Sequence, residues 1–235
     1  MRKVVIIIGT AHLGVTLGKL SVDGRLREPV FSRKIAQDLY YILTGFGYTV
    51  YIDYMPLEPN ALMKGRTQSD IQDKELRWRV QRVKEICARH SAQECLYVSL
   101  HVDAAGMGDK WMQGGGFTVW TSKGQTRGDL LAECIYDAAD RNLTTYKQLM
   151  LDGKAKGWYS DKQQPLRTDT SDGDRDREAN HYVTRHTPCP ACLVEMMFMD
   201  NEHDVDYLLS DEGYWELVRT IQEGILLYVQ RYIEE

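Results

Sequence analysis

Val4-Val5-Ile6-Ile7-Ile8-Gly9-Thr10-Ala11-His12-Leu13-Gly14 is the stretch of sequence that decides the fold of this chain. Its five β-branched apolar residues in a row predict a strand that is buried on both faces, which is typical of the centre of a parallel sheet. In open α/β sheets, ligands bind outside the carboxyl ends of the strands. His12 comes just after this predicted strand, so it stands where chemistry is expected.

The composition is that of a globular protein. The chain has 235 residues, of which 27% are charged and 43% hydrophobic, enough for one or two domains with a large core. A net charge of −5 argues against a nucleic-acid-binding surface, which usually has a basic excess. Five cysteines make a disulfide framework improbable at this length.

The sequence also bears on the membrane and on export. No apolar stretch approaches the length of a membrane span, so we expect no membrane insertion. Residues 1–8 are too short for the apolar region of a signal peptide and lack a cleavage site. We therefore expect a chain made in the cytoplasm, which would reach an outside substrate only by release or another export route.

Strand and helix patterns alternate along the chain, which predicts an α/β fold. We expect a single domain over residues 1–235, with a mostly parallel twisted sheet of about five or six strands and helices on both faces. The predicted strands are 3–8, 48–54, 94–103, 116–121 and 191–198; the predicted helices are about 29–45, 69–90, 129–141 and 213–233.

A polar segment interrupts this alternation over about residues 142–187. We interpret it as an insertion beside the site, because a core strand follows it. Residues 168–178 cannot bury an apolar face and are expected to form a mobile, solvated loop, with a lid as the alternative. Their Asp-rich pattern lacks the spacing and the closing Glu of an EF-hand calcium loop.

Three residues are candidate metal ligands. His12 follows the first strand, His101 lies near the end of strand 94–103, and Glu28 stands at the start of a helix. If the two strands are neighbours, all three side chains can meet at one edge of the sheet. Zinc hydrolases use three such ligands and leave a fourth position for water. The alternatives are a Glu28 that only favours a helix N-terminus and a His101 that is a hydrogen-bonded strand histidine.

Glu195 is the most informative anomaly, because it interrupts the apolar strand 191–198. An ionised carboxylate in apolar surroundings is costly unless a cation or a hydrogen-bond donor meets it. Such a residue fits a general base beside a metal-bound water. The alternative is a structural ion pair, for which Arg185 is the candidate partner.

Four segments, in this order, resemble the zinc-dependent N-acetylmuramoyl-L-alanine amidases of the amidase-3 type. Gly9-Thr10-Ala11-His12-Leu13-Gly14 is similar to the family's Asp-x-Gly-His-Gly turn, and Glu28 matches its helix-start Glu. Ser99-Leu100-His101-Val102-Asp103 resembles its Ser-x-His-x-Asn segment. Leu193-Val194-Glu195, followed by Phe198 and Asn201, resembles its closing Leu-Val-Glu strand.

The resemblance covers nearly the whole chain and implies a specific site. It implies a Zn²⁺ held by His12, Glu28 and His101, with Glu195 as the catalytic carboxylate. The implied substrate is peptidoglycan, at the amide that joins the lactyl group of N-acetylmuramic acid to L-alanine. The absence of a secretion signal and of wall-binding repeats would fit a phage or prophage endolysin.

The chain departs from the family pattern at three positions. Gly9 replaces the family's Asp, Ala11 replaces its Gly, and Asp103 stands where the family prefers Asn. None of these removes a ligand, but they leave substrate preference open. Two other functions remain as alternatives: a zinc carboxypeptidase or aminopeptidase of similar fold, and a non-catalytic glycan-binding relative.

Two cysteines form a further motif, Cys189-Pro190-Ala191-Cys192. A structural zinc site needs four ligands, and the chain has no second Cys pair of this kind. The motif precedes a strand, whereas the thioredoxin-type motif opens a helix. We therefore disfavour both a redox role and a second zinc site. His181 and His186, in the polar segment, are expected at the surface, with an approach of either to the substrate as the alternative.

Overall fold

One six-stranded sheet forms the centre of the computed structural model, which describes residues 3–14, 16–53 and 64–233. The strand order is β2-β1-β3-β6-β4-β5. The first four strands in this order, β2, β1, β3 and β6, run parallel to one another. β4 is antiparallel to β6, and β5 is parallel to β4. The predicted α/β class with a mostly parallel sheet is confirmed. The strands are β1 (Val5–Thr10), β2 (Thr49–Asp53), β3 (Cys95–Asp103), β4 (Thr118–Thr121), β5 (Arg177–Glu178) and β6 (Ala191–Phe198).

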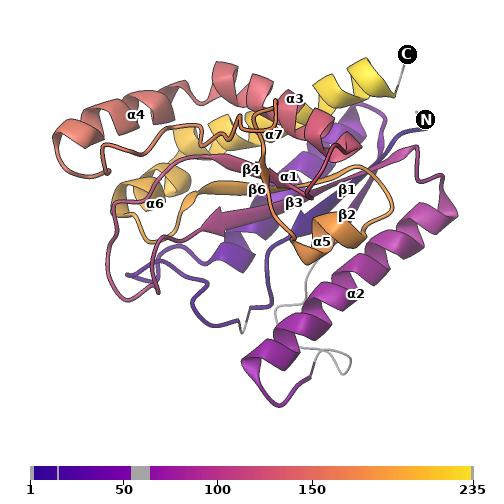
Figure 1. Cartoon of the computed structure of the whole chain (residues 1–235), viewed down its shortest axis with the longest axis horizontal. Coiled ribbons are helices and arrows are strands. Elements are labelled where there is room, and N and C mark those ends of the chain that lie inside the picture. Colours follow the sequence, from indigo (N-terminus) through magenta and orange to yellow (C-terminus); the bar gives the residue numbers. More distant parts are fainter. Residues whose placement is uncertain (1–2, 15, 54–63, 234–235) are drawn as a thin grey trace.

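Helices cover both faces of this sheet, as predicted (Figure 1). Helices α1, α3 and α7 pack on one face, and α2 and α5 pack on the other. None of the helices in the described ranges is long and apolar enough to cross a bilayer. The helices are α1 (Glu28–Gly45), α2 (Gln68–Arg89), α3 (Arg127–Asn142), α4 (Thr144–Ala155), α5 (Tyr182–His186), α6 (Glu202–Leu209) and α7 (Asp211–Tyr232).

Strand β1 shows why the sheet is buried on both faces. Ile6 and Ile8 belong to the core beneath α1, α3 and α7, whereas Val5 and Ile7 belong to the core beneath α2 and α5. Side chains alternate between the faces of a strand, so only a continuous apolar run can fill both cores. β1 pairs with β2 on one side and β3 on the other, which places it inside the sheet.

The polar segment 142–187 contains more structure than the sequence predicted. It includes α4, β5 and α5, and the short helix α6 after β6 was also missed. The Arg175 guanidinium contacts the carboxylates of Glu133, Asp137 and Asp140 on α3, and the Thr121 hydroxyl donates a hydrogen bond to Asp176. Ion pairs therefore attach the 168–178 loop to α3. The expectation of a mobile loop considered only the lack of an apolar face and not these ion pairs.

A β-bulge lies at the end of β6, just after the candidate catalytic residue Glu195. His101 of β3 is opposite Glu195, but Asp103 is opposite Phe198, so β6 has one residue more than β3 in this interval. Met197 within the bulge has a φ of 61°, in the left-handed region. A bulge bends its strand and changes the direction of nearby side chains. Here it ends the regular pairing just after Glu195.

Gly9 provides a test of the packing beneath the first turn. A Cβ at Gly9 would overlap the hydroxyl of Tyr97, whose side chain is completely buried. We expect Gly9→Ala to lower the free energy of unfolding by about 1–3 kcal/mol, the usual cost of overpacking a core. Urea unfolding measures this change.

Gly45 offers the matched control, because a Cβ there would meet no atom within 4 Å. We expect Gly45→Ala to be neutral or to stabilise by less than about 1 kcal/mol. Equal stabilities of the two variants would contradict the tight contact between Gly9 and Tyr97.

Candidate metal centre

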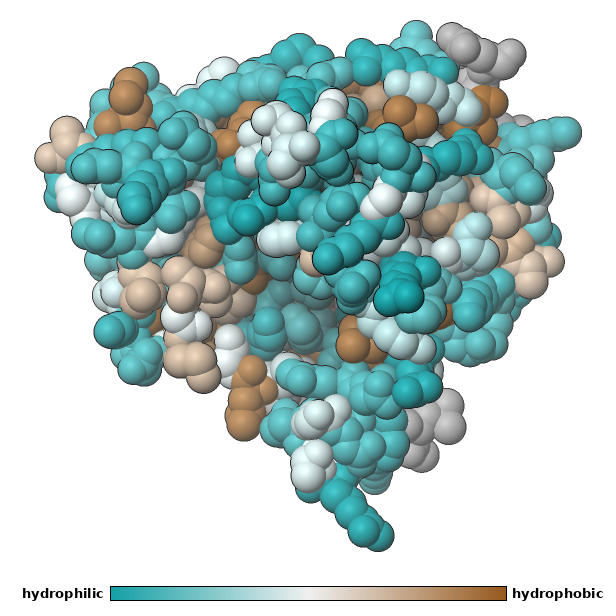
Figure 2. Space-filling view, in the orientation of Figure 1, coloured by the Kyte–Doolittle hydropathy of each residue, from teal (hydrophilic) through white to brown (hydrophobic). Residues whose placement is uncertain are grey.

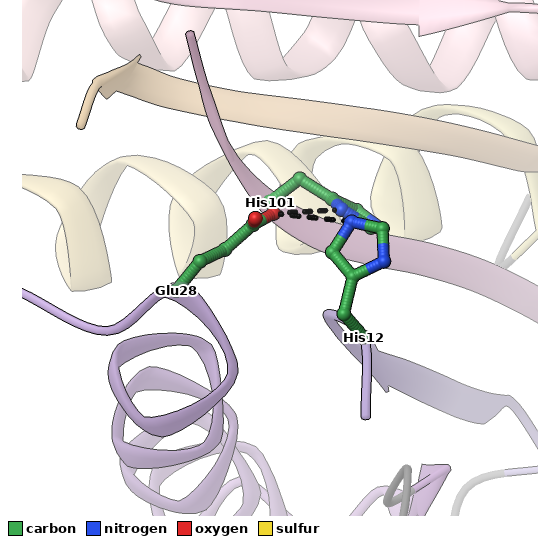
Figure 3. Close-up of side chains that lie close together, drawn as sticks. All are labelled: His12, Glu28 and His101. Carbon is green, nitrogen blue, oxygen red and sulfur yellow. Dashed lines mark hydrogen bonds and ion pairs between the residues drawn. The ribbon is translucent and has the colours of Figure 1, made fainter. Parts of the chain in front are cut away.

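Three side chains from separate elements meet at the carboxyl edge of the sheet (Figure 3). His12 comes from the turn after β1, Glu28 from the first turn of α1, and His101 from near the end of β3. One potential ligand atom from each residue lies within 4.8 Å of the others. The three sequence-predicted ligand candidates are therefore adjacent in space, although 89 positions separate the first from the last.

Glu28 is the centre of this cluster. Its Oε1 atom lies 3.0 Å from His101 Nδ1 and 3.6 Å from His12 Nε2, so both imidazoles face one oxygen. The backbone N–H of Val102 donates to the same oxygen at 3.2 Å. The other oxygen, Oε2, lies 3.5 Å from Lys19 Nζ. The side chain of Glu28 is buried and points into the site, so it does not cap its own helix.

The surroundings favour ligand-competent protonation states. Burial alone would raise the pKa of Glu28, but His12, the hydrogen bond with His101 and Lys19 together lower it to about 2. Burial lowers the pKa of His101 to about 4, against the opposing effect of Glu28. Near neutral pH, Glu28 is therefore ionised and His101 is neutral, and these are the forms that bind a metal ion.

The turn that carries His12 has unusual backbone geometry. His12 has a φ of 24°, which is rare for a residue other than glycine. The preceding N–H, that of Ala11, donates to Ser32 Oγ of α1 at 2.9 Å and so attaches the turn to the helix that carries Glu28. Backbone strain of this kind is frequent at functional sites. The turn directs the imidazole toward Glu28 rather than along the strand.

Glu195 lies beside the three candidate ligands. It is the direct pairing partner of His101 on the neighbouring parallel strand, so both side chains emerge on the same face of the sheet. Its Oε2 atom is enclosed, with no hydrogen-bond partner among the described residues. Burial, together with the charges of Asp103 and Glu28, raises its pKa well above the ordinary value. Arg185, the partner considered in the structural alternative, is exposed and lines a different cavity from the one that Glu195 lines.

A cavity of about 450 Å³ opens over this cluster. Its wall combines His12, His101 and Glu195 with the cations Lys19 and Arg79, and α5 closes one side. Figure 2 shows a mostly hydrophilic face that is hollowed between α2, at its lower edge, and the rest of the molecule. The candidate ligands therefore face a space large enough for a substrate group.

Three residues of the site were missed or misplaced by the sequence analysis. Glu75 and Arg79 of α2 are buried at the cavity wall. Their four-residue spacing, beside the apolar face of the predicted helix, is the sequence signal that could have indicated their burial. For His181 the surface position was the main expectation, but the alternative of an approach to the substrate fits better, because it is half-buried, lines the cavity and packs edge-on against Trp120. His186 is exposed, as predicted.

The donor set fits a zinc ion. Two imidazole nitrogens and one carboxylate oxygen are a common ligand set of catalytic zinc, which keeps a fourth position for water. Here His12 and His101 line the cavity from which a water or substrate would approach. Glu28 Oε2 has no hydrogen-bond partner among the described residues, and it faces the ammonium group of Lys19 at 3.5 Å. The five cysteines are all free and buried, which agrees with the prediction of no disulfide framework.

Comparison with known families and structures gives a consistent result. The family model described as "Amidase_3: N-acetylmuramoyl-L-alanine amidase" matches residues 6–226. No curated protein matches the chain. Several solved structures share the fold, although their sequence identity is low.

Three of these structures illustrate the similarity. The CwlD amidase of Clostridioides difficile, solved with the GerS lipoprotein, has a TM-score of 0.69 at 18% identity, covering 96% of this chain and 98% of its own. The amidase AmiC2 of Nostoc punctiforme has a TM-score of 0.63 at 23% identity, covering 98% of this chain and 99% of its own. Ami1 of Mycobacterium smegmatis has a TM-score of 0.62 at 17% identity, covering 97% of each chain.

The burial of His101 predicts a pH-dependent stability of the metal-free protein. The pKa of His101 is about 4 in the folded protein and about 6.5 for a free histidine, so the unfolded chain binds this proton more readily. Its contribution to stability is complete above about pH 6.5 and is lost as the pH falls toward 4. We expect the His101 ring to titrate near pH 4 by NMR.

The same reasoning gives a comparison between variants. We expect the unfolding free energy of metal-free His101→Asn to fall less than that of the wild type between pH 6.5 and 4.5. A His101 ring that titrates near 6.5 in the folded protein would contradict the burial described above.

Proposed function

We propose a zinc-dependent mechanism for this chain, which belongs to the Amidase_3 family of N-acetylmuramoyl-L-alanine amidases. In this proposal His12, Glu28 and His101 hold the zinc ion. Glu195 acts as the general base. The family match assigns the enzyme class, a peptidoglycan hydrolase that cleaves the amide between N-acetylmuramic acid and L-alanine. The observation that carries the proposed zinc site is the convergence of the three ligand atoms within 4.8 Å.

The residues of the site divide the reaction between them. A bound zinc ion would supply Lewis-acid chemistry, acidifying the attacking water and polarising the scissile carbonyl. Glu195 removes the proton from the attacking water and then gives a proton to the departing amine of L-alanine. Its raised pKa suits the first step, because such a carboxylate accepts a proton more readily than an ordinary one.

Lys19 provides positive charge on the side of Glu28 that faces away from the imidazoles. It lies in the cavity wall, and its charge also lowers the pKa of Glu195, against the larger effect of burial. We infer that Lys19 offsets the charge of the two carboxylates when the substrate displaces water from the cavity.

A zinc peptidase of similar fold would act on the same polymer, so the products must distinguish the two activities. We propose digestion of purified peptidoglycan followed by mass spectrometry. An amidase releases intact stem peptides that begin with L-alanine, whereas a peptidase shortens the stems and leaves L-alanine attached to the glycan. A non-catalytic glycan-binding relative would release neither product.

The role of Glu195 predicts a separation of metal binding from catalysis. We expect Glu195→Gln to retain one zinc ion per chain and to lower peptidoglycan hydrolysis by at least about 10²–10⁴-fold, because the amide cannot take up a proton. Hydrolysis is followed by the release of stem peptides. Glu202→Gln, at the exposed start of α6, is the control and should retain full activity. A Glu195→Gln variant as active as the wild type would exclude the proposed base.

The ligand set predicts the metal content of a second pair of variants. We expect His12→Ala to lose stoichiometric zinc, because only two of the three protein ligands remain. His186→Ala removes an exposed histidine outside the site and should retain the metal. Elemental analysis of the purified proteins, after dialysis against metal-free buffer, measures the difference. Retention of zinc by both variants would remove His12 from the ligand set.

A further inference from the structure

Each candidate histidine ligand has a partner on the ring nitrogen that faces away from Glu28. His12 presents Nε2 to Glu28, and its Nδ1 lies 3.5 Å from Oε1 of Glu75 on α2. His101 presents Nδ1 to Glu28, and its Nε2 lies 3.1 Å from Oγ of Ser99, two residues earlier on β3. The two imidazoles thus use opposite nitrogens toward the site, and each distal nitrogen meets a different group.

One buried guanidinium joins these two groups. Arg79 Nη2 lies 3.6 Å from Glu75 Oε1, one helical turn away, and Nη1 donates to Ser99 Oγ at 3.4 Å. Nη1 also donates to the hydroxyl of Tyr97 at 3.4 Å. The side chain of Arg79 is only 1% exposed and Glu75 only 3%. Arg79 is therefore the common neighbour of both partners of the histidines.

The chemistry of Arg79 sets the direction of the surrounding hydrogen bonds. A guanidinium only donates, so Ser99 Oγ must accept from Arg79 and has a second lone pair for an N–H of His101 Nε2. Glu75, ionised beside Arg79, only accepts, and it favours the proton of His12 on Nδ1. In the metal-free protein the 3.0 Å contact with ionised Glu28 favours a proton on His101 Nδ1. If a metal ion takes the place of that proton, the partners on the distal nitrogens favour rings whose lone pairs face Glu28, as a metal ligand requires.

We propose that Glu75 and Arg79 of α2 are positioning residues that set the tautomers of His12 and His101 for binding zinc, Glu75 acting directly on His12 and Arg79 acting through Glu75 and Ser99. This inference rests on the proposed zinc site. It gives α2 a function beyond covering the sheet. It also explains a buried charge pair at the cavity wall, where an apolar pair would pack without the cost of desolvating charges.

The test compares zinc affinity among folded variants of the 235-residue chain. Glu75→Gln keeps the size of the side chain and removes its charge. We expect zinc affinity, measured by competition with a chromogenic chelator, to fall about 10–100-fold, the usual effect of removing an outer partner of a metal-bound histidine. Asp73→Asn is the matched control, because it breaks an exposed pair with Arg77 of the same i,i+4 spacing on the same helix. Its zinc affinity should stay within about twofold of the wild type.

A second readout separates positioning from a purely structural role. With ¹⁵N-labelled histidine, NMR identifies the ring nitrogen that carries the proton in each assigned imidazole. In the zinc-loaded wild type we expect the proton on Nδ1 of His12 and on Nε2 of His101. In metal-free Glu75→Gln we expect His12 to populate both tautomers, whereas loss of a structural contact alone would not change this ratio.

Two further variants keep the test decisive if Glu75→Gln does not fold. The double variant Glu75→Gln/Arg79→Met removes both charges, so no unpaired guanidinium remains buried. Ser99→Ala removes the partner of His101, together with one of the acceptors of Arg79, and leaves the contact between Glu75 and His12 in place. We expect both to weaken zinc binding at least about 10-fold.

Two results would count against the inference. Folded Glu75 and Ser99 variants with wild-type zinc affinity and unchanged tautomers would overturn it and leave the proposed zinc site intact. A wild-type chain that binds no zinc would overturn the proposed function and this inference with it.

Discussion

The buried carboxylate of Glu28 is the group on which the rest of the site depends. Its side chain is only 1% exposed, and a charge so placed is costly unless cations or donors surround it. The donors come from separate elements: His12 after β1, His101 on β3, the Val102 N–H and Lys19. The fold must bring the end of β1, the start of α1 and the end of β3 together to meet this one group.

The parallel sheet makes that meeting possible. β1 and β3 are direct neighbours and run in the same direction, so the residues after their carboxyl ends share one edge. β6 pairs with β3 and sets Glu195 opposite His101, and the bulge that follows ends the regular ladder there. The candidate ligands and the candidate base are therefore held by the backbone of four elements, β1, α1, β3 and β6, with residues of α2 and α5 in the cavity wall.

Much of the fold and the four central residues could be predicted from sequence, for identifiable reasons. The run Val4–Ile8 is apolar at every position, because strand β1 is buried on both faces. Glu195 is conspicuous because it interrupts another apolar run. Helices α4, α5 and α6 were missed because they are short or lie in a polar segment whose anchors are ion pairs such as that of Arg175. Local patterns do not report ion pairs between distant residues.

The sequence by itself determined the alternation of strands and helices, the double burial of β1, and the resemblance that selects His12, Glu28, His101 and Glu195. These features are local, since each depends on residue type and short-range spacing. Only the tertiary structure decided which nitrogen of each histidine faces Glu28, that Glu75 and Arg79 reach the two rings from α2, and that His181 lines the cavity. The physical reason is that these contacts join segments far apart in the chain, and only the register of the sheet and the packing of α2 against it set their distances.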